Sequence, residues 1–201
     1  MPSRPTSGQR PPTFIEQARR TQLIDATIGL VARHGYAGTS LARIAEAAQI
    51  SKATVLYHFP SKDAVVRAAY ESVIEGLTAQ VGTAVGTHTG AAALYAYIRS
   101  LVGHLHERPE RARVIAEAIL GDDEVTDRPG SAARWRAVAD LVEAARIVGD
   151  YRADVDPRIT AIMINGAIDA IVAERMADPA FDTPGAAEQL VTMLSRSLGT
   201  T

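Results

Sequence analysis

The stretch TSLARIAEAAQISKATVLYHFPSK, residues 39–62, decides the fold of this chain. Apolar residues recur at helical spacing in its first half, which predicts a short helix with one side docked on a neighbouring element. Thr39 or Ser40 is expected to cap this helix, because a side-chain oxygen there accepts a backbone N–H of the first turn. Residues 49–51 are expected to form a tight turn into a second helix.

The second helix is predicted to run from Lys52 to about Phe59, with Ser51 as its N-cap and Pro60 as its stop. Val55 and Phe59 then face inward. The outer side presents a cation, a small residue, a hydroxyl and two rings that can donate hydrogen bonds: Lys52, Ala53, Thr54, Tyr57 and His58. A helix with this outer face suits the major groove of DNA, where such groups reach phosphates and base edges.

Three segments in this region resemble the DNA-binding region of the TetR family of transcriptional repressors. They read LIDATIGLVARHGYAGTS (residues 23–40), IAEAAQISKATVLYHF (44–59) and PSKDAV (60–65). The resemblance covers about a quarter of the chain and is specific, because the segments occur in the right order and spacing. One departure is Ala53, which stands where the family often has glycine. The rest of the chain resembles the family in helical layout alone.

The resemblance implies a homodimer that binds a pseudo-palindromic operator in double-stranded DNA, with one recognition helix in each major groove. A small-molecule effector in the C-terminal helices would favour a conformer whose recognition helices no longer fit the operator. Candidate base contacts are Lys52, Thr54 and His58. Candidate phosphate contacts are Tyr57, Lys62, Thr39 and Ser40, while Arg43 suits either role and Ser51 and Ala53 complete the predicted surface.

Composition and charge agree with this interpretation. The 201 residues are 47% hydrophobic and contain no Cys, which excludes disulfides and thiolate metal sites. No apolar run approaches the roughly 20 residues that cross a bilayer, and the cytoplasm is the expected location. Residues 1–62 carry eight Lys and Arg against three Asp and Glu, a net charge of +5, whereas the remainder carries −7. A basic N-terminal part on an acidic body is typical of a DNA-binding unit attached to a separate domain.

The helical periodicity predicts an all-α protein of about nine helices in two parts. Residues 1–13, rich in Pro, are expected to be a disordered arm. Residues 14–61 form the predicted helix-turn-helix domain, and residues 62–201 form the predicted ligand-binding and dimerisation bundle. A linking helix is expected from Lys62 to about Val81, followed by a loop over residues 82–90. Further helices are predicted over residues 91–107, 109–120, 132–148, 158–176 and 183–198.

Two surfaces of the bundle are predicted from the same periodicity. A ligand site is expected among large or adaptable side chains of the bundle, namely Tyr97, Leu101, His104, Trp135 and Met163. Tyr95 and Arg99 are further candidates for the same site. The helix over residues 158–176 is apolar nearly all round, which predicts burial on both sides. Either a second copy or the chain's own core covers it, and the family layout favours a four-helix dimer interface. The candidates are Ile162, Gly166, Ala170, Ala173, Leu190, Val191 and Leu194.

Enzymatic function finds no support in the sequence. It contains no glycine-rich phosphate loop, nucleophile elbow or zinc-protease motif, and we predict neither a cofactor nor a metal. His104 and His106 are two residues apart and therefore point to different sides of a helix. The alternatives are a helical small-molecule-binding protein or enzyme with a structural N-terminal unit, and a TetR-like activator. The ligand-released repressor is the favoured hypothesis.

Overall fold

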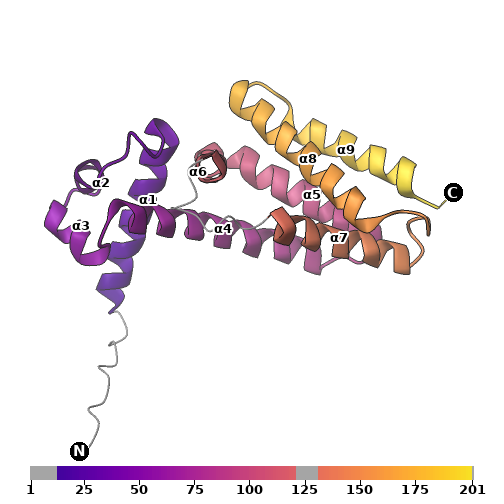
Figure 1. Ribbon diagram of the computed structural model, residues 1–201, viewed down its shortest axis with the longest axis horizontal. Coiled ribbons are helices and arrows are strands. Elements are labelled where there is room, and N and C mark those ends of the chain that lie inside the picture. The colour runs from indigo at the N-terminus through magenta and orange to yellow at the C-terminus, as the bar shows by residue number, and fades with distance from the viewer. Residues whose placement is uncertain (1–12, 121–130, 201) are drawn as a thin grey trace, which may run out of the picture.

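The computed structural model describes residues 13–120 and 131–200, and within them the chain is all helical apart from turns and one isolated β-bridge. The predicted disordered arm lies outside the described residues, except for Thr13. The helices are α1 (Phe14–His34), α2 (Leu41–Ala47), α3 (Lys52–His58), α4 (Lys62–Gly86), α5 (Gly90–Glu107), α6 (Pro109–Leu120), α7 (Ser131–Ile147), α8 (Pro157–Ala177) and α9 (Thr183–Leu198). We call α1–α3 the head and α4–α9 the body. Figure 1 shows the head at one end of α4 and the other body helices along the rest of it.

The head helices begin where short polar side chains cap them. Ser40 Oγ accepts the Arg43 N–H at 3.3 Å and therefore caps α2, which decides between the two predicted residues. Ser51 Oγ accepts the Thr54 N–H at 3.1 Å, as expected for α3. Gln49, between α2 and α3, adopts φ +56°, a left-handed conformation uncommon outside glycine. This conformation reverses the chain within two residues and sets the angle between the two short helices.

The head has its own apolar cluster, to which α4 also contributes. Its buried members are Leu23, Leu30, Ile44, Ala45, Ala48, Val55, Phe59 and Val65. Val55 and Phe59, the predicted inward residues of α3, are 0% and 2% exposed. Arg20 of α1 places its guanidinium carbon 4.1 Å from the Phe59 ring centroid and donates to the His58 carbonyl oxygen at 2.6 Å. These contacts hold α3 against α1 with its opposite side free.

The linking helix α4 is longer than predicted. It continues to Gly86, so the expected end near Val81 and the expected loop over residues 82–90 are wrong. Glycine costs about 1 kcal/mol in a helix interior, and Gly82 nevertheless lies inside α4. The helix continues because Val81 is buried in the body core and Val85 packs against it. Tertiary packing therefore outweighs the local preference.

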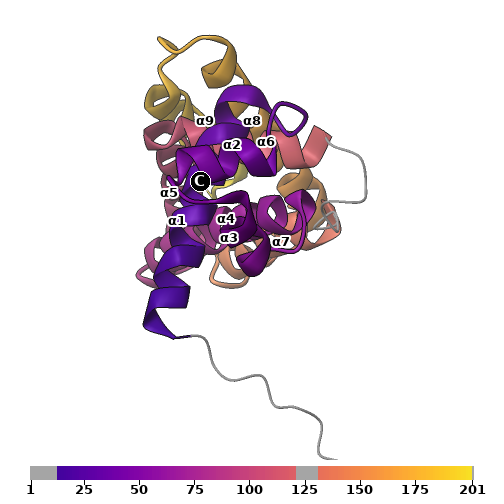
Figure 2. The ribbon, with the colours of Figure 1, turned by 90° about the vertical axis from the view of Figure 1, so that its left-hand side faces the viewer.

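The body is built around α5, which packs against α4, α7, α8 and α9. Leu94 and Ile98 of α5 are fully buried in the main cluster, together with Val138 and Val142 of α7. Figure 2, seen from the head end, shows the head in front of the body helices. No helix in the described ranges is both long and apolar enough to span a bilayer.

Candidate functional site

The outer side of α3 exposes polar side chains of the head. Lys52 and Ala53 are exposed, Tyr57 is 73% exposed and Thr54 is half-buried. The Thr54 hydroxyl lies 2.8 Å from the Ser51 hydroxyl, so the cap also orients the first turn of α3. The structure thus places the predicted recognition residues on one short helix, with Lys52, Ala53 and Tyr57 more exposed than Thr54 and His58.

Tyr57 is oriented by a contact that the sequence did not reveal. Its hydroxyl donates to Oε1 of Glu16 at 3.1 Å, and Oε2 of Glu16 accepts the Thr13 N–H at 2.7 Å. These hydrogen bonds, from the Thr13 backbone first, hold the pKa of Glu16 below its usual value. Because Glu16 and Tyr57 are 41 residues apart, only the docking of α1 on α3 pairs them. The ring stands on the exposed side of the head as a result.

His58 lies beside Tyr57 but is half-buried. Its ring contacts the Tyr57 ring edge-on, with centroids 5.0 Å apart. Burial lowers the pKa of His58, and the nearby Arg20 guanidinium lowers it further. The imidazole is therefore neutral near pH 7 and can both donate and accept a hydrogen bond.

The first turn of α2 carries one incorrect prediction. Thr39 is 2% exposed and its hydroxyl donates to the Gly35 carbonyl oxygen at 2.8 Å. Its side chain therefore holds the α1–α2 turn together and is not available for the predicted phosphate contact. Ser40 and Arg43 are exposed, and Arg43 donates to the Gly38 carbonyl oxygen at 2.6 Å.

Lys62 stands at the first turn of α4, where backbone N–H groups also favour anions. Its ammonium donates to the Tyr36 carbonyl oxygen at 3.1 Å and lies 3.6 Å from the centroid of the Tyr36 ring. The lysine is half-buried, so the charge is held in one place rather than free in solvent. The phosphate contact of Lys62 stays a prediction, and these contacts define where its ammonium group lies.

The predicted ligand residues do not form one cluster. Tyr97 and Trp135 pack against the main body core, to which the buried Leu101 belongs. His104 is 2% exposed, and its Nδ1 lies 2.5 Å from Oε1 of Gln80. Met163 is 68% exposed, so its assignment to the ligand site is wrong. It belongs to the outer side of α8, because Ile164 and Asn165 occupy the inner side.

Arg99, a further candidate for the ligand site, already has a partner in the body. Arg99 is engaged in a two-pronged ion pair with Glu188 at 2.6 and 2.8 Å, which joins α5 to α9 at the surface. A small apolar cavity of about 20 Å³ lies where α5, α6 and α8 meet, beside His106 and Arg175. It has room for about one water molecule.

We expect His104 to make the stability of the body depend on pH. Burial lowers the pKa of His104, and Arg108 and Arg111 lower it further against Glu107 and Glu110. Below the unfolded-state pKa of about 6.5, the unfolded chain takes up a proton that the folded chain resists. We expect the unfolding free energy to fall as the pH drops below about 6.5. The His104→Gln variant should show a shallower fall in denaturant titrations, after normalisation at about pH 8. An unchanged pH dependence would show that His104 does not contribute.

The residues of the predicted dimer surface are exposed on α8 and buried within the chain on α9. Ile162, Gly166, Ala170 and Ala173 of α8 are exposed and form an outer stripe. Leu190, Val191 and Leu194 of α9 are 5–7% exposed within one chain, so their assignment to a partner interface is wrong. They face the chain's own core because α9 packs on α5 and α8.

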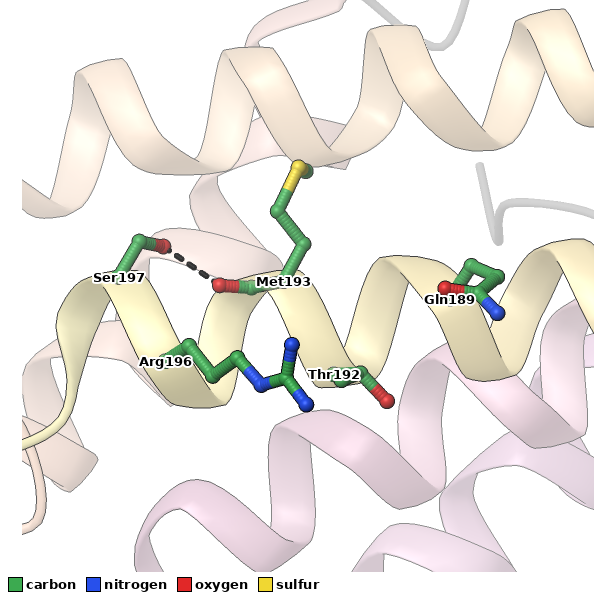
Figure 3. A pocket seen from close by; sticks show the side chains of 5 residues that line it. All are labelled: Gln189, Thr192, Met193, Arg196 and Ser197. Atoms are coloured by element: carbon green, nitrogen blue, oxygen red, sulfur yellow. Dashed lines mark hydrogen bonds between the residues drawn. The ribbon is translucent and has the colours of Figure 1, made fainter.

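The outer side of α9 carries different residues. They line a surface groove of about 380 Å³ and are Gln189, Thr192, Met193, Arg196 and Ser197. Figure 3 shows these five side chains along one stretch of α9, with the Ser197 hydroxyl donating to the Met193 carbonyl oxygen at 2.7 Å. The exposed side of α9 is therefore mixed polar and apolar, unlike the apolar stripe of α8.

The head of this chain is similar in sequence to a known family of proteins. The family described as "Bacterial regulatory proteins, tetR family" matches residues 23–69, the segment from the middle of α1 into α4. The HTH-type transcriptional regulator RutR of Escherichia coli is 29% identical over 115 residues, 57% of this chain and 53% of that protein. The regulator BetI of Paraburkholderia xenovorans is 39% identical over 67 residues, 33% of this chain and 34% of BetI. The chain thus spans about half the length of the first curated relatives, or less.

Solved structures match over nearly the full chain. The fatty acid degradation regulator FadR from Bacillus halodurans has a TM-score of 0.79 at 19% identity, covering 96% of this chain and 98% of that one. FadR from Bacillus subtilis, solved in complex with stearoyl-CoA, has a TM-score of 0.76 at 20% identity and covers 88% and 97%. At these identities the likeness concerns the fold. With the helix-turn-helix match and the all-helical architecture, it leads to one conclusion: residues 23–69 are the helix-turn-helix segment described for the TetR family of bacterial regulatory proteins, on a chain with the fold of TetR-type regulators.

Proposed function

We propose that this protein is a cytoplasmic transcriptional repressor that binds a pseudo-palindromic operator as a homodimer and is released by a small molecule. The observation that carries the proposal is the exposed side of α3, which presents Lys52, Ala53 and Tyr57 on a head with its own core. The family match covers the same helix. In this proposal residues 14–61 read DNA, and residues 62–201 dimerise and bind the effector.

Roles within the head follow from position and chemistry. Lys52, Thr54 and His58 are proposed to contact base edges, since they lie on α3. Ser40 and Tyr57 are proposed to hold the phosphate backbone, as is Lys62, and Arg43 remains a candidate for either role. Ser51 contributes by capping α3 rather than by an interaction that distinguishes sequences.

Effector control requires that the ligand bind two conformers with different affinity. Nε2 of His104 is buried and has no hydrogen-bond partner within the described residues. A polar group of a ligand would satisfy this nitrogen, and Tyr97, Leu101 and Trp135 lie on the same body core. The stearoyl-CoA complex of the B. subtilis neighbour supports a small molecule as the effector class.

The proposal is tested by selecting duplexes from random DNA with the full chain. The selected duplex and a scrambled one are then titrated by fluorescence anisotropy at two salt concentrations. We expect an enriched palindrome bound by two subunits with at least about 10³-fold preference over the scrambled duplex. Recovery of no preferred sequence, with weak binding to both duplexes, would contradict the proposal.

Lys62→Ala should weaken binding to all DNA. It removes a cation held at the start of α4, so we expect the slope of log affinity against log salt to become shallower by about one unit. Lys62→Arg keeps the charge and is the matched control, which should retain the parent slope. A parental slope in the alanine variant would show that Lys62 does not neutralise a phosphate.

A further inference from the structure

A side chain of the body holds the backbone of the head. Glu117 of α6 accepts the Tyr36 N–H through Oε2 at 3.0 Å, although the two residues are 81 positions apart. Tyr36 lies in the turn between α1 and α2. Both views place α6 beside α1 (Figure 1 and Figure 2), and the two helices pack against each other. The hydrogen bond therefore joins the effector-binding part of the proposed repressor to its DNA-binding part.

The turn is shaped so that the carboxylate can approach. Gly35 has φ +68° and ψ 177°, a conformation essentially restricted to glycine. A Cβ atom at Gly35 would lie 3.1 Å from Oε2 of Glu117, closer than such contacts ordinarily are. The absence of a side chain at residue 35 thus serves both the backbone conformation and the approach of Glu117.

Tyr36 also contacts residues at the starts of α2 and α4. Its carbonyl oxygen accepts from Lys62 Nζ at 3.1 Å and from the Thr39 N–H at 3.1 Å. Its hydroxyl donates to Asp63, and its ring lies under the Lys62 ammonium. The position of the Tyr36 backbone therefore sets the start of α2 and the first turn of α4.

We propose that Glu117 is a positioning residue for DNA recognition, which fixes the head on the body through the Tyr36 N–H. The proposal rests on the DNA-binding function proposed above. Along the chain only α4 connects head to body, and Ile28 and Val31 of α1 share a buried apolar cluster with Val114 of α6. Glu117 adds a directional hydrogen bond to this apolar contact, so a displacement of α6 moves the turn that orients α2 and α3. Within the part of the chain that the structure describes, the hydrogen bond of Glu117 goes to a backbone N–H and not to a side chain predicted to touch DNA.

The test compares Glu117→Ala, Glu117→Gln and Glu110→Ala in the full chain. The glutamine carbonyl can still accept the Tyr36 N–H, whereas alanine cannot. Glu110 is an exposed residue of the same helix, and its replacement changes the net charge by the same amount as Glu117→Ala. Each variant is titrated with the selected operator and a scrambled duplex at several salt concentrations. Amide hydrogen exchange at Tyr36 is measured without DNA.

We expect Glu117→Ala to lose roughly tenfold in preference for the operator over the scrambled duplex, with the salt slope unchanged because no phosphate contact is lost. Its Tyr36 amide should exchange at least about tenfold faster, with helical content retained. Glu117→Gln should recover most of both properties, and Glu110→Ala should match the parent. Parental preference in Glu117→Ala would overturn the proposal, as would a loss equalled by Glu110→Ala.

The exchange measurement separates this proposal from the proposed function. If the parent selects no operator, the repressor proposal fails. Parental exchange at Tyr36 in Glu117→Ala would then overturn the positioning proposal independently. Accelerated exchange would retain Glu117 as the attachment of the head and remove only its consequence for DNA. A large loss of helical content in both Glu117 variants would assign the residue a general folding role and also overturn the proposal.

Discussion

Replacing Ile162 by aspartate is expected to separate the proposed dimer and to weaken operator binding by about three orders of magnitude. Ile162 is 49% exposed in the single chain and lies on the outer stripe of α8 with Gly166 and Ala170. A charge on this stripe would have to lose its water at the interface between two copies. A separated subunit contacts one half-site only, so its binding should approach nonspecific affinity. Light scattering coupled to size exclusion and operator titration measure the two effects.

Ala137→Asp is the matched control for this experiment. Ala137 is exposed on α7, a different helix from the one that carries the stripe, and its replacement changes the net charge by the same amount. We expect the control to remain dimeric and to bind the operator like the parent. A dimeric Ile162→Asp protein with parental affinity would show that the two copies meet through another surface.

Replacing Phe59 by alanine is expected to destabilise the head by about 3–5 kcal/mol. Phe59 is 2% exposed and closes the head cluster against Val55, with Arg20 over its ring. The substitution removes buried apolar surface and leaves a cavity, and it also removes the partner of the Arg20 guanidinium. The body core shares no buried residue with the head cluster, so α5–α9 should remain folded. Operator binding should be lost at temperatures where the body is still helical.

Phe59→Leu tests whether volume or the aromatic ring matters. A change between large apolar residues usually costs under about 1.5 kcal/mol, and the lost cation–π contact adds roughly 0.5–1 kcal/mol. Circular dichroism melting and residue-resolved hydrogen exchange would separate head from body. If the alanine variant melted like the parent in both parts, the assignment of Phe59 to the head core would be incorrect.

Local chemistry was sufficient to predict most helix boundaries. Ser51 accepts the N–H group expected of an N-cap, Ser61 caps α4 in the same way, and α1 begins at Phe14, where the predicted helix-turn-helix domain begins. These signals are readable because the cap and the groups it satisfies lie within four residues. The inward positions of α3 followed from helical periodicity for the same reason. The family resemblance then supplied the groove-binding role, which no spacing in this chain establishes.

Helix packing decided what local pattern could not. The pattern of α9 predicts a broad apolar stripe, but not whether Leu190 and Leu194 face a second copy or the chain's own α5. Likewise, the local sequence predicted that the linking helix ends near Val81, whereas packing of Val81 and Val85 in the body core extends it to Gly86. The contacts of Tyr57 with Glu16 and of Tyr36 with Glu117 span 41 and 81 residues. The sequence by itself determined the helices and their polar caps, because these depend on near neighbours. The tertiary structure alone decided which faces stayed exposed and which distant side chains met, because burial is shared among all the elements that pack together.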